Sequence, residues 1–311
     1  MIENLIFLFI FLLLLTKSAE YAIKYSKIVA RKLHISEFII SFFIVALISA
    51  LPEGTISILS AINGEPQLGL GTLIGSNVAD LALVFGIAAI ASGTGISVKT
   101  KLLKKDMFYL ALLFFPVLSG LDGYYSRLEG VILIVAGLSF FFSLSSSSNL
   151  FKKKEYSVTP KFFIKNLLFL IFSLALLIIS AHYTIKYGVI LANGLGLPEV
   201  LIGLTVISIG SCLPELIFSL KAIRNKRDEL ALGDILGTVI TDCTILVGIM
   251  ALISPFSFDP MITYVTGFAM FFAGVIVTIF INTEKLLTKK EGIILLIFYI
   301  IFLAVEFYIH R

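Results

Sequence analysis

The chain has 311 residues, of which 59% are hydrophobic and only 14% are charged, and its formal net charge is +4. Soluble domains carry roughly 25% charged residues, so this composition excludes an ordinary soluble protein, and the small, dispersed positive charge argues against a nucleic-acid partner. We therefore expect a multi-pass protein of the cell membrane, surrounded by the lipid bilayer.

Apolar runs of about 20 residues, long enough to cross a bilayer, follow one another along almost the whole chain. They predict an all-α membrane protein with ten transmembrane helices. The predicted helices span approximately residues 4–26, 38–60, 68–92, 107–122, 128–147, 164–188, 198–220, 230–253, 261–281 and 292–309. One markedly polar stretch, residues 148–161, separates the first five helices from the last five.

The first half of the chain recurs in the second half at a constant spacing of 162 residues. The segment Ser18–Tyr25 matches Ser180–Tyr187, and Ser49–Glu53 matches Ser211–Glu215. The same spacing carries Gly71, Gly75, Asp80 and Gly86 onto Gly233, Gly237, Asp242 and Gly248. This duplication predicts a five-helix repeat over residues 1–147, a cytoplasmic linker over 148–163 and a second repeat over 164–311.

Lys and Arg residues gather in alternate connections, those after the first, third, fifth, seventh and ninth predicted helices. Because basic loops face the cytoplasm, both termini are expected outside. Five helices per repeat make the second repeat inverted relative to the first. Inverted repeats are typical of transporters with a midplane substrate site and alternating access. The alternative, a duplication that serves only to build a stable bundle, does not explain paired acids in the most apolar helices.

The second and seventh predicted helices each carry a proline followed by an acid. Pro52 lacks an N–H and frees a backbone carbonyl near Ile48, while Ser49 lies on the same helical face as Glu53. In a bilayer the freed oxygen needs a partner, and a cation can serve. The second repeat has the same arrangement in Gly210, Ser211, Pro214 and Glu215.

The third and eighth predicted helices each add a hydroxyl and an acid four residues apart, and hence on one face. Hard cations such as Ca²⁺ prefer oxygen ligands, and the chain has no His or Cys cluster suited to zinc or copper. The alternatives are that the acids have structural partners and that the neighbouring glycines serve only helix packing. The candidate cation ligands are Ser49, Glu53, Ser76, Asp80, Ser211, Glu215, Thr238 and Asp242.

These residues resemble the motifs of the sodium/calcium exchanger family of cation/calcium antiporters, which has two inverted five-helix repeats. The paired motifs here are residues 48–53 with 210–215, and residues 75–80 with 237–242. The resemblance implies that Glu53 and Glu215 bridge Ca²⁺, assisted by backbone oxygens at Ser49 and Ser211. It also implies Na⁺ sites formed with Ser76, Asp80, Thr238 and Asp242.

The chain departs from the family pattern at several positions. Ala50 and Cys212 replace a serine that the family usually has, which puts the Na⁺ sites in doubt. Asp80 stands where many members of the family have an asparagine, so the site has four acids. The additional acid resembles the acid-rich sites of potassium-dependent relatives, or it serves to carry a proton. Thr72 and Asp234 replace the asparagine that usually follows the leading glycine.

Lys17 lies in the middle of the apolar first helix and has three interpretations. It pairs with Glu20 one turn further on, it snorkels toward an interface, or it neutralises Asp80 or Asp242 and replaces a transported ion. We keep all three open at this point.

We predict a secondary antiporter that exchanges Ca²⁺ for Na⁺, with both cations competing for the midplane carboxylates. The alternatives are an H⁺- or K⁺-coupled calcium antiporter on the same fold and, in a different class, a cation channel. An enzyme is not expected, because the acids have no Ser-His pair, metal-binding His motif or phosphate loop beside them. We expect no cofactor. The oligomeric state is open, and a monomer suffices.

Overall fold

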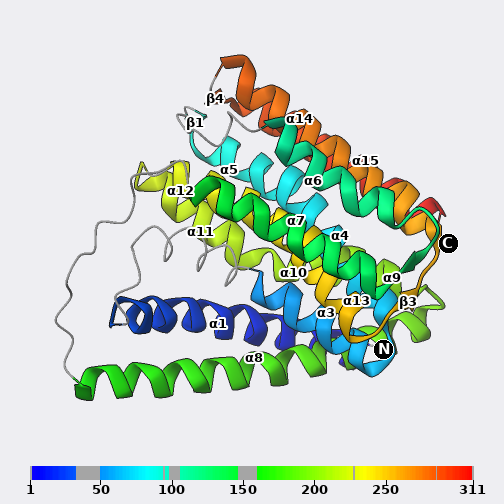
Figure 1. Ribbon diagram of the computed structural model, residues 1–311, viewed down its shortest axis with the longest axis horizontal. Helices are drawn as coiled ribbons and strands as arrows, with labels where there is room; N and C mark the ends of the chain where they lie inside the picture. Colours follow the sequence, from blue (N-terminus) through cyan, green and yellow to red (C-terminus); the bar gives the residue numbers. More distant parts are fainter. Residues whose placement is uncertain are drawn as a thin grey trace.

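The computed structural model describes residues 2–32, 50–93, 95–97, 106–145, 160–226, 228–284 and 286–309. These residues are mostly helical, and the helices form one bundle with α1 and α8 along one edge (Figure 1). Predicted positions that fall between the described ranges, Ser49 among them, lie outside this description.

In the first half of the chain, the described helices agree with the predicted segments to within several residues, except that only residues 50–60 of the predicted helix 38–60 lie in the described ranges. They are α1 (Ile2–Lys32), α3 (Leu51–Asn63), α4 (Pro66–Val78), α5 (Phe85–Ala91), α6 (Asp106–Ser119) and α7 (Arg127–Ser145). A π-helical segment, η2 (Ala79–Val84), joins α4 to α5 without a break.

In the second half, the predicted helices are again present, but several are divided into shorter pieces. They are α8 (Pro160–Leu195), α9 (Glu199–Ile202), η4 (Gly203–Ile207), α10 (Ser208–Ser211), α11 (Leu213–Arg224), α12 (Asp228–Ile240), η5 (Thr241–Leu246), α13 (Val247–Ile253), η6 (Ile262–Gly267), α14 (Phe268–Glu284) and α15 (Lys289–Ile309).

Seven of the described helical stretches are long and apolar enough to cross a membrane. They are Glu3–Ala22, Pro66–Ala91, Phe162–Leu195, Glu199–Arg224, Ala231–Ile253, Ile262–Thr283 and Lys289–Ile309. The shorter apolar helix Met107–Ser119 falls below this length. The chain is therefore a helical membrane protein with multiple spans, while the count of ten and the side on which the termini lie stay predictions.

The element boundaries repeat at the spacing of the sequence duplication. The run α3, α4, η2, α5 corresponds to α11, α12, η5, α13, and each element in the second run begins 162 residues after its counterpart. The division of the chain at the 148–163 linker remains a prediction, because residues 146–159 are outside the described ranges.

The two counterpart helices α1 and α8 run antiparallel along each other (Figure 1). Their aromatic rings stack in antiparallel register, with centroid distances of 5.1 Å for Phe7–Tyr187, 4.6 Å for Phe11–Tyr183 and 5.1 Å for Tyr25–Phe169. Such stacks contribute about 0.5–1.5 kcal/mol each beyond their burial. Opposite directions for counterpart helices are what inverted repeats require.

Two glycine contacts bring the halves together in matching ways. A Cβ at Gly86 would lie 2.9 Å from the Gly292 carbonyl oxygen, and one at Gly248 would lie 2.6 Å from the Gly130 carbonyl oxygen. Gly86 and Gly130 have Gly248 and Gly292 as counterparts, so the α5–α15 contact is repeated as α13–α7. Only glycine permits this approach of two helix backbones.

Two pairs of two-residue strands, which helical periodicity does not predict, also join the halves. Antiparallel β1 (Ile96–Ser97) pairs with β4 (Leu286–Leu287), and β2 (Tyr124–Tyr125) pairs with β3 (Phe256–Ser257).

The buried apolar side chains form two separate clusters. The larger one fills the space among α4–α7 and α11–α15. The smaller one lies between the α1–α8 pair and the rest, and includes Leu12, Ile185, Leu68 and Ile207. The α1–α8 pair therefore packs on the bundle through a core of its own.

Candidate cation-binding site

Glu53 and Glu215 both lie in the first turn of a helix, α3 and α11 respectively. Pro52 and Pro214 occupy that first turn. In the second repeat, α10 ends at Ser211 and α11 begins at Leu213, and Cys212 between them keeps right-handed helical angles, with φ −75° and ψ −1°. Because Glu199–Arg224 is one helical stretch, Pro214 interrupts its hydrogen bonding without ending it, while the residues immediately before Ala50 lie outside the described ranges.

Both glutamates are buried in the protein and do not face lipid. Glu53 is 1% exposed and Glu215 is 0% exposed. In the described part of the chain, neither oxygen of either carboxylate has a hydrogen-bond partner. Ser211 lies near Glu53, but its hydroxyl donates to the Ser208 carbonyl at 3.1 Å. Buried carboxylates without partners are costly, which is typical of a site made for a ligand.

Asp80 and Asp242 each lie at the second residue of a π-helical segment, η2 and η5. A π-helical turn contains an extra residue and is frequent at functional sites. Both aspartates are buried. The Ser76 hydroxyl is 3.3 Å from Asp242 Oδ2, and it also donates to the Leu73 carbonyl at 2.9 Å. The structure thus brings a hydroxyl of the first repeat next to an acid of the second.

The four predicted acids gather in one region of the bundle. Glu53 is near enough to Asp80, Glu215 and Asp242 for their charges to interact. Asp80 interacts in the same way with Glu215 and Asp242. Like charges repel strongly in the low dielectric of a membrane protein interior. The cluster therefore favours a bound positive charge.

The acids do not close around a single point. Among the described residues, no three His, Cys, Asp or Glu side chains converge closely enough to hold one metal ion as they stand. The mutual repulsion of the carboxylates is a physical reason for this separation.

The remaining predicted ligands have mixed surroundings. Thr238 is fully buried on α12, and within the described ranges its hydroxyl has no hydrogen-bond partner. Ser49 lies outside the described residues, so its backbone and side chain are not placed. The Cys212 thiol, where the family usually has a serine, donates to the Ser76 carbonyl at 3.5 Å.

Sequence reasoning missed one acid of this region. Asp234 on α12 is 3% exposed and interacts electrostatically with Glu53, Asp80 and Glu215. It was noted only as a departure from the family pattern. The signal was present, since Asp234 precedes Thr238 by four residues and so lies on the same helical face.

One more buried acid lies on α15. Glu306 accepts a hydrogen bond from the Thr266 hydroxyl on η6. It has no counterpart acid, because the equivalent position in the first repeat is Leu144.

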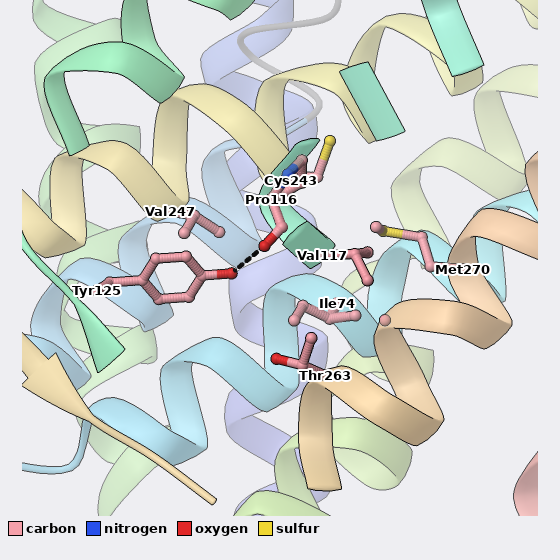
Figure 2. Close-up of a pocket in the computed structure, with 9 residues that line it drawn as sticks. Ile74, Pro116, Val117, Tyr125, Cys243, Val247, Thr263 and Met270 are labelled. Carbon is pink, nitrogen blue, oxygen red and sulfur yellow. Dashed lines mark hydrogen bonds between the residues drawn. The ribbon is translucent and has the colours of Figure 1, made fainter. Parts of the chain in front are cut away.

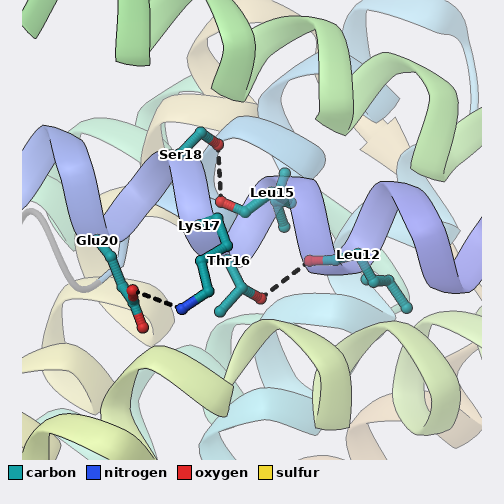
Figure 3. A network of polar contacts seen from close by, with 6 residues as sticks. All are labelled: Leu12, Leu15, Thr16, Lys17, Ser18 and Glu20. Carbon is teal, nitrogen blue, oxygen red and sulfur yellow. Dashed lines mark hydrogen bonds and ion pairs between the residues drawn. The ribbon is translucent and has the colours of Figure 1, made fainter. Parts of the chain in front are cut away.

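Lys17 pairs with Glu20, one of the three interpretations of the sequence. Lys17 Nζ lies 2.9 Å from Glu20 Oε2, and the two side chains reach toward each other along α1 (Figure 3). The Lys17 side chain is 59% exposed. The hypothesis that its ammonium group neutralises Asp80 or Asp242 is wrong, because both aspartates are buried and their charge interactions do not include Lys17.

A small, mainly apolar pocket lies among α4, α6, β2, η5, α13, η6 and α14 (Figure 2). At one end the Tyr125 hydroxyl donates to the Pro116 carbonyl at 2.7 Å. Burial raises the pKa of Tyr125, so this phenol remains a donor. The predicted cation ligands do not line the pocket, whose walls are Ile74, Pro116, Val117, Tyr125, Cys243, Val247, Thr263, Gly267 and Met270.

The chain is similar to known proteins over nearly its whole length. The sequence model of the family described as sodium/calcium exchanger protein matches residues 3–144 and 165–308. The chain is 28% identical to the sodium/calcium exchanger MaX1 of Methanosarcina acetivorans, covering 98% of this chain and 99% of that protein. It is also 28% identical to the inner membrane protein YrbG of Escherichia coli, covering 80% of each.

Solved structures of the sodium-calcium exchanger NCX_Mj have the same fold. One superposes with a TM-score of 0.68 at 24% identity, covering 97% of this chain and 98% of that one, and another has a TM-score of 0.69. The exchangers among these relatives are ion antiporters of the membrane and not enzymes. With the family model matching nearly the whole length, the chain belongs to the sodium/calcium exchanger family.

Proposed function

We propose that this chain is a secondary antiporter that exchanges Ca²⁺ for Na⁺ by alternating access. The observation that carries the proposal is the set of four buried, mutually repelling carboxylates supplied by both repeats. Oxygen ligands of this kind suit hard cations. The names of the related exchangers supply the two cations, and none of the cited names mentions H⁺ or K⁺.

The proposed site consists of Glu53, Glu215, Asp80 and Asp242 with the hydroxyl-bearing residues Ser49, Ser76, Ser211 and Thr238. One Ca²⁺ or several Na⁺ ions offset the same negative charges, so the cations compete. With no cation bound, the carboxylates repel one another in a medium of low dielectric. That cost makes the return of an unloaded site unfavourable and couples the two fluxes.

The proposed topology has ten transmembrane helices in two inverted repeats, with both termini outside. The antiparallel α1–α8 pair and the matching contacts α5–α15 and α13–α7 support the inversion. The basic connection after α11, which contains Lys221, Arg224 and Lys226, is placed in the cytoplasm. A monomer contains the whole site.

The test is ⁴⁵Ca²⁺ uptake into proteoliposomes under separately imposed Na⁺, K⁺ and H⁺ gradients. The proposal expects uptake driven by the Na⁺ gradient alone. Glu53→Gln and Glu215→Gln each keep the side-chain volume and remove one charge, so each should abolish exchange while the protein still elutes as a monodisperse peak. Uptake driven only by H⁺ or K⁺, or full exchange in either variant, would overturn the proposal.

A further inference from the structure

Asp234 makes the buried acid cluster asymmetric. Its counterpart in the first repeat is Thr72, whose hydroxyl donates to the Leu68 carbonyl of its own helix at 2.8 Å. The other four buried acids of the cluster occur as counterpart pairs, Glu53 with Glu215 and Asp80 with Asp242. The second repeat therefore contributes one negative charge more than the first.

Asp234 cannot share a single cation with Asp242. The two lie eight residues apart along α12 and η5, which corresponds to about 12 Å along a helix. Asp234 nevertheless interacts with Glu215 on α11 and with Glu53 on α3. Asp234 lies on α12, the helix packed against α11, and is nearer than Asp242 to the N-terminal end of α12 at Asp228.

Two buried hydroxyl groups lie on either side of Asp234 along the packed helices α11 and α12. Ser219 follows Glu215 by one turn of α11, and within the described residues its hydroxyl has no hydrogen-bond partner. Its counterpart Ser57 donates across to the Gly69 carbonyl on α4 at 2.9 Å. Ala231 on α12 is the counterpart of Gly69. By this correspondence, we infer that the Ser219 hydroxyl faces Ala231, one turn before Asp234.

The second hydroxyl is that of Thr238, one turn beyond Asp234 on the same face of α12. It is fully buried, and no described residue forms a hydrogen bond with it. Buried hydroxyls without partners beside two carboxylates offer the oxygen ligands that a hard cation takes.

We propose that Asp234, Glu215 and Ser219 form a second cation position, displaced from the central acids toward the connection between α11 and α12. This inference rests on the proposed function, which places that connection in the cytoplasm. Calcium arriving from the cytoplasm would be held first at this position and then passed to the central carboxylates. The first repeat has no such position, because Thr72 carries no charge.

The test is the Asp234→Asn variant in proteoliposomes, with the half-saturating Ca²⁺ concentration measured separately on each side of the membrane. Loss of one charged ligand should raise this concentration about tenfold on the cytoplasmic side. On the opposite side it should change less than about twofold. The matched control is Thr72→Val, which removes the counterpart hydroxyl and should leave both sides unchanged.

A second measurement does not depend on transport. The melting temperature of the purified protein in detergent should rise with added Ca²⁺, and Asp234→Asn should need about ten times more Ca²⁺ for the same rise. A melting temperature without Ca²⁺ equal to or above that of the unmodified protein shows that the variant folds.

An equal effect of Asp234→Asn on both sides, or no effect in either measurement, would overturn the second cation position. These results leave the proposed function intact if the unmodified protein still exchanges Ca²⁺ for Na⁺. A loss of exchange in the unmodified protein would instead refute the proposed function itself.

Discussion

The hydroxyl of Thr16 on α1 lies 3.4 Å from the carbonyl oxygen of Gly210, and 2.9 Å from the carbonyl oxygen of Leu12 in its own helix. Gly210 is the residue four positions before Pro214, whose ring nitrogen cannot donate to that carbonyl. Thr16 therefore supplies a donor to a carbonyl that the proline leaves without one. A Cβ at Gly210 would lie 2.9 Å from the Leu12 side chain, so glycine also permits the close approach of α1.

Thr16→Val should weaken the attachment of α1 to α10, because valine has the same shape and lacks the hydroxyl. We expect a loss of about 1 kcal/mol in the free energy of unfolding, measured in mixed detergent micelles. The matched control is Thr184→Val on α8, because among the described residues the Thr184 hydroxyl donates only within its own helix, to the Ser180 carbonyl at 2.9 Å. Equal losses in the two variants would show that the contact with Gly210 contributes nothing.

Removing the charge of an acid in the cluster should reduce Ca²⁺ exchange, whereas removing the charge of a buried acid elsewhere should not. Asp242→Asn keeps an acceptor for the Ser76 hydroxyl but removes a charge from the cluster, so Ca²⁺ exchange should fall at least about tenfold. Glu306→Gln also keeps an acceptor, for the Thr266 hydroxyl, and should retain exchange. The measurement is the initial rate of ⁴⁵Ca²⁺ uptake by each variant at a saturating Na⁺ gradient, compared with that of the unmodified protein. Comparable losses in both variants would mean that general burial of charge, and not membership of the cluster, determines the effect.

The candidate acids of the site could be identified from the sequence because the duplication marks them twice. Glu53 and Glu215 recur at the same spacing after a proline, and the structure places both of them buried in a first helical turn. The inversion of the repeats followed from the odd number of predicted helices, and the antiparallel stacking of α1 on α8 agrees with it.

Other features could not be predicted for identifiable reasons. The π-helical turns at Asp80 and Asp242 change the backbone by one residue, which hydrophobic periodicity does not register. Strands of two residues are too short to show alternation. Asp234 occurs in one repeat only, so a search for paired acids passed over it. The Thr16–Gly210 contact joins residues distant in sequence, and no local pattern indicates it.

The glycine contacts between the halves should tolerate no side chain. Gly248→Ala would place a Cβ 2.6 Å from the Gly130 carbonyl oxygen and 2.7 Å from the Ile134 side chain. Backbone atoms cannot move aside cheaply, so we expect a loss of about 1–3 kcal/mol in stability. Gly194→Ala on α8 is the matched control, because nothing lies within 4 Å of its Cβ position. That variant should be neutral or more stable by up to about 1 kcal/mol. The melting temperatures of the two variants in detergent test this prediction, and equal melting temperatures would contradict the close contact at Gly248.

The pairing of Lys17 with Glu20 predicts that the lysine has no part in selecting the transported ion. Exposed ion pairs contribute about 0–1 kcal/mol, and this one is 59% and 30% exposed. Lys17→Met removes the ammonium group and retains the long apolar stem, but it leaves Glu20 without its partner. The double variant with Glu20→Gln restores neutrality. Both variants should keep the Na⁺ dependence of Ca²⁺ uptake unchanged, and the double variant should be at least as stable as the single one. A changed number of Na⁺ ions per Ca²⁺ in the double variant would mean that Lys17 acts on the site through a conformation other than the one described.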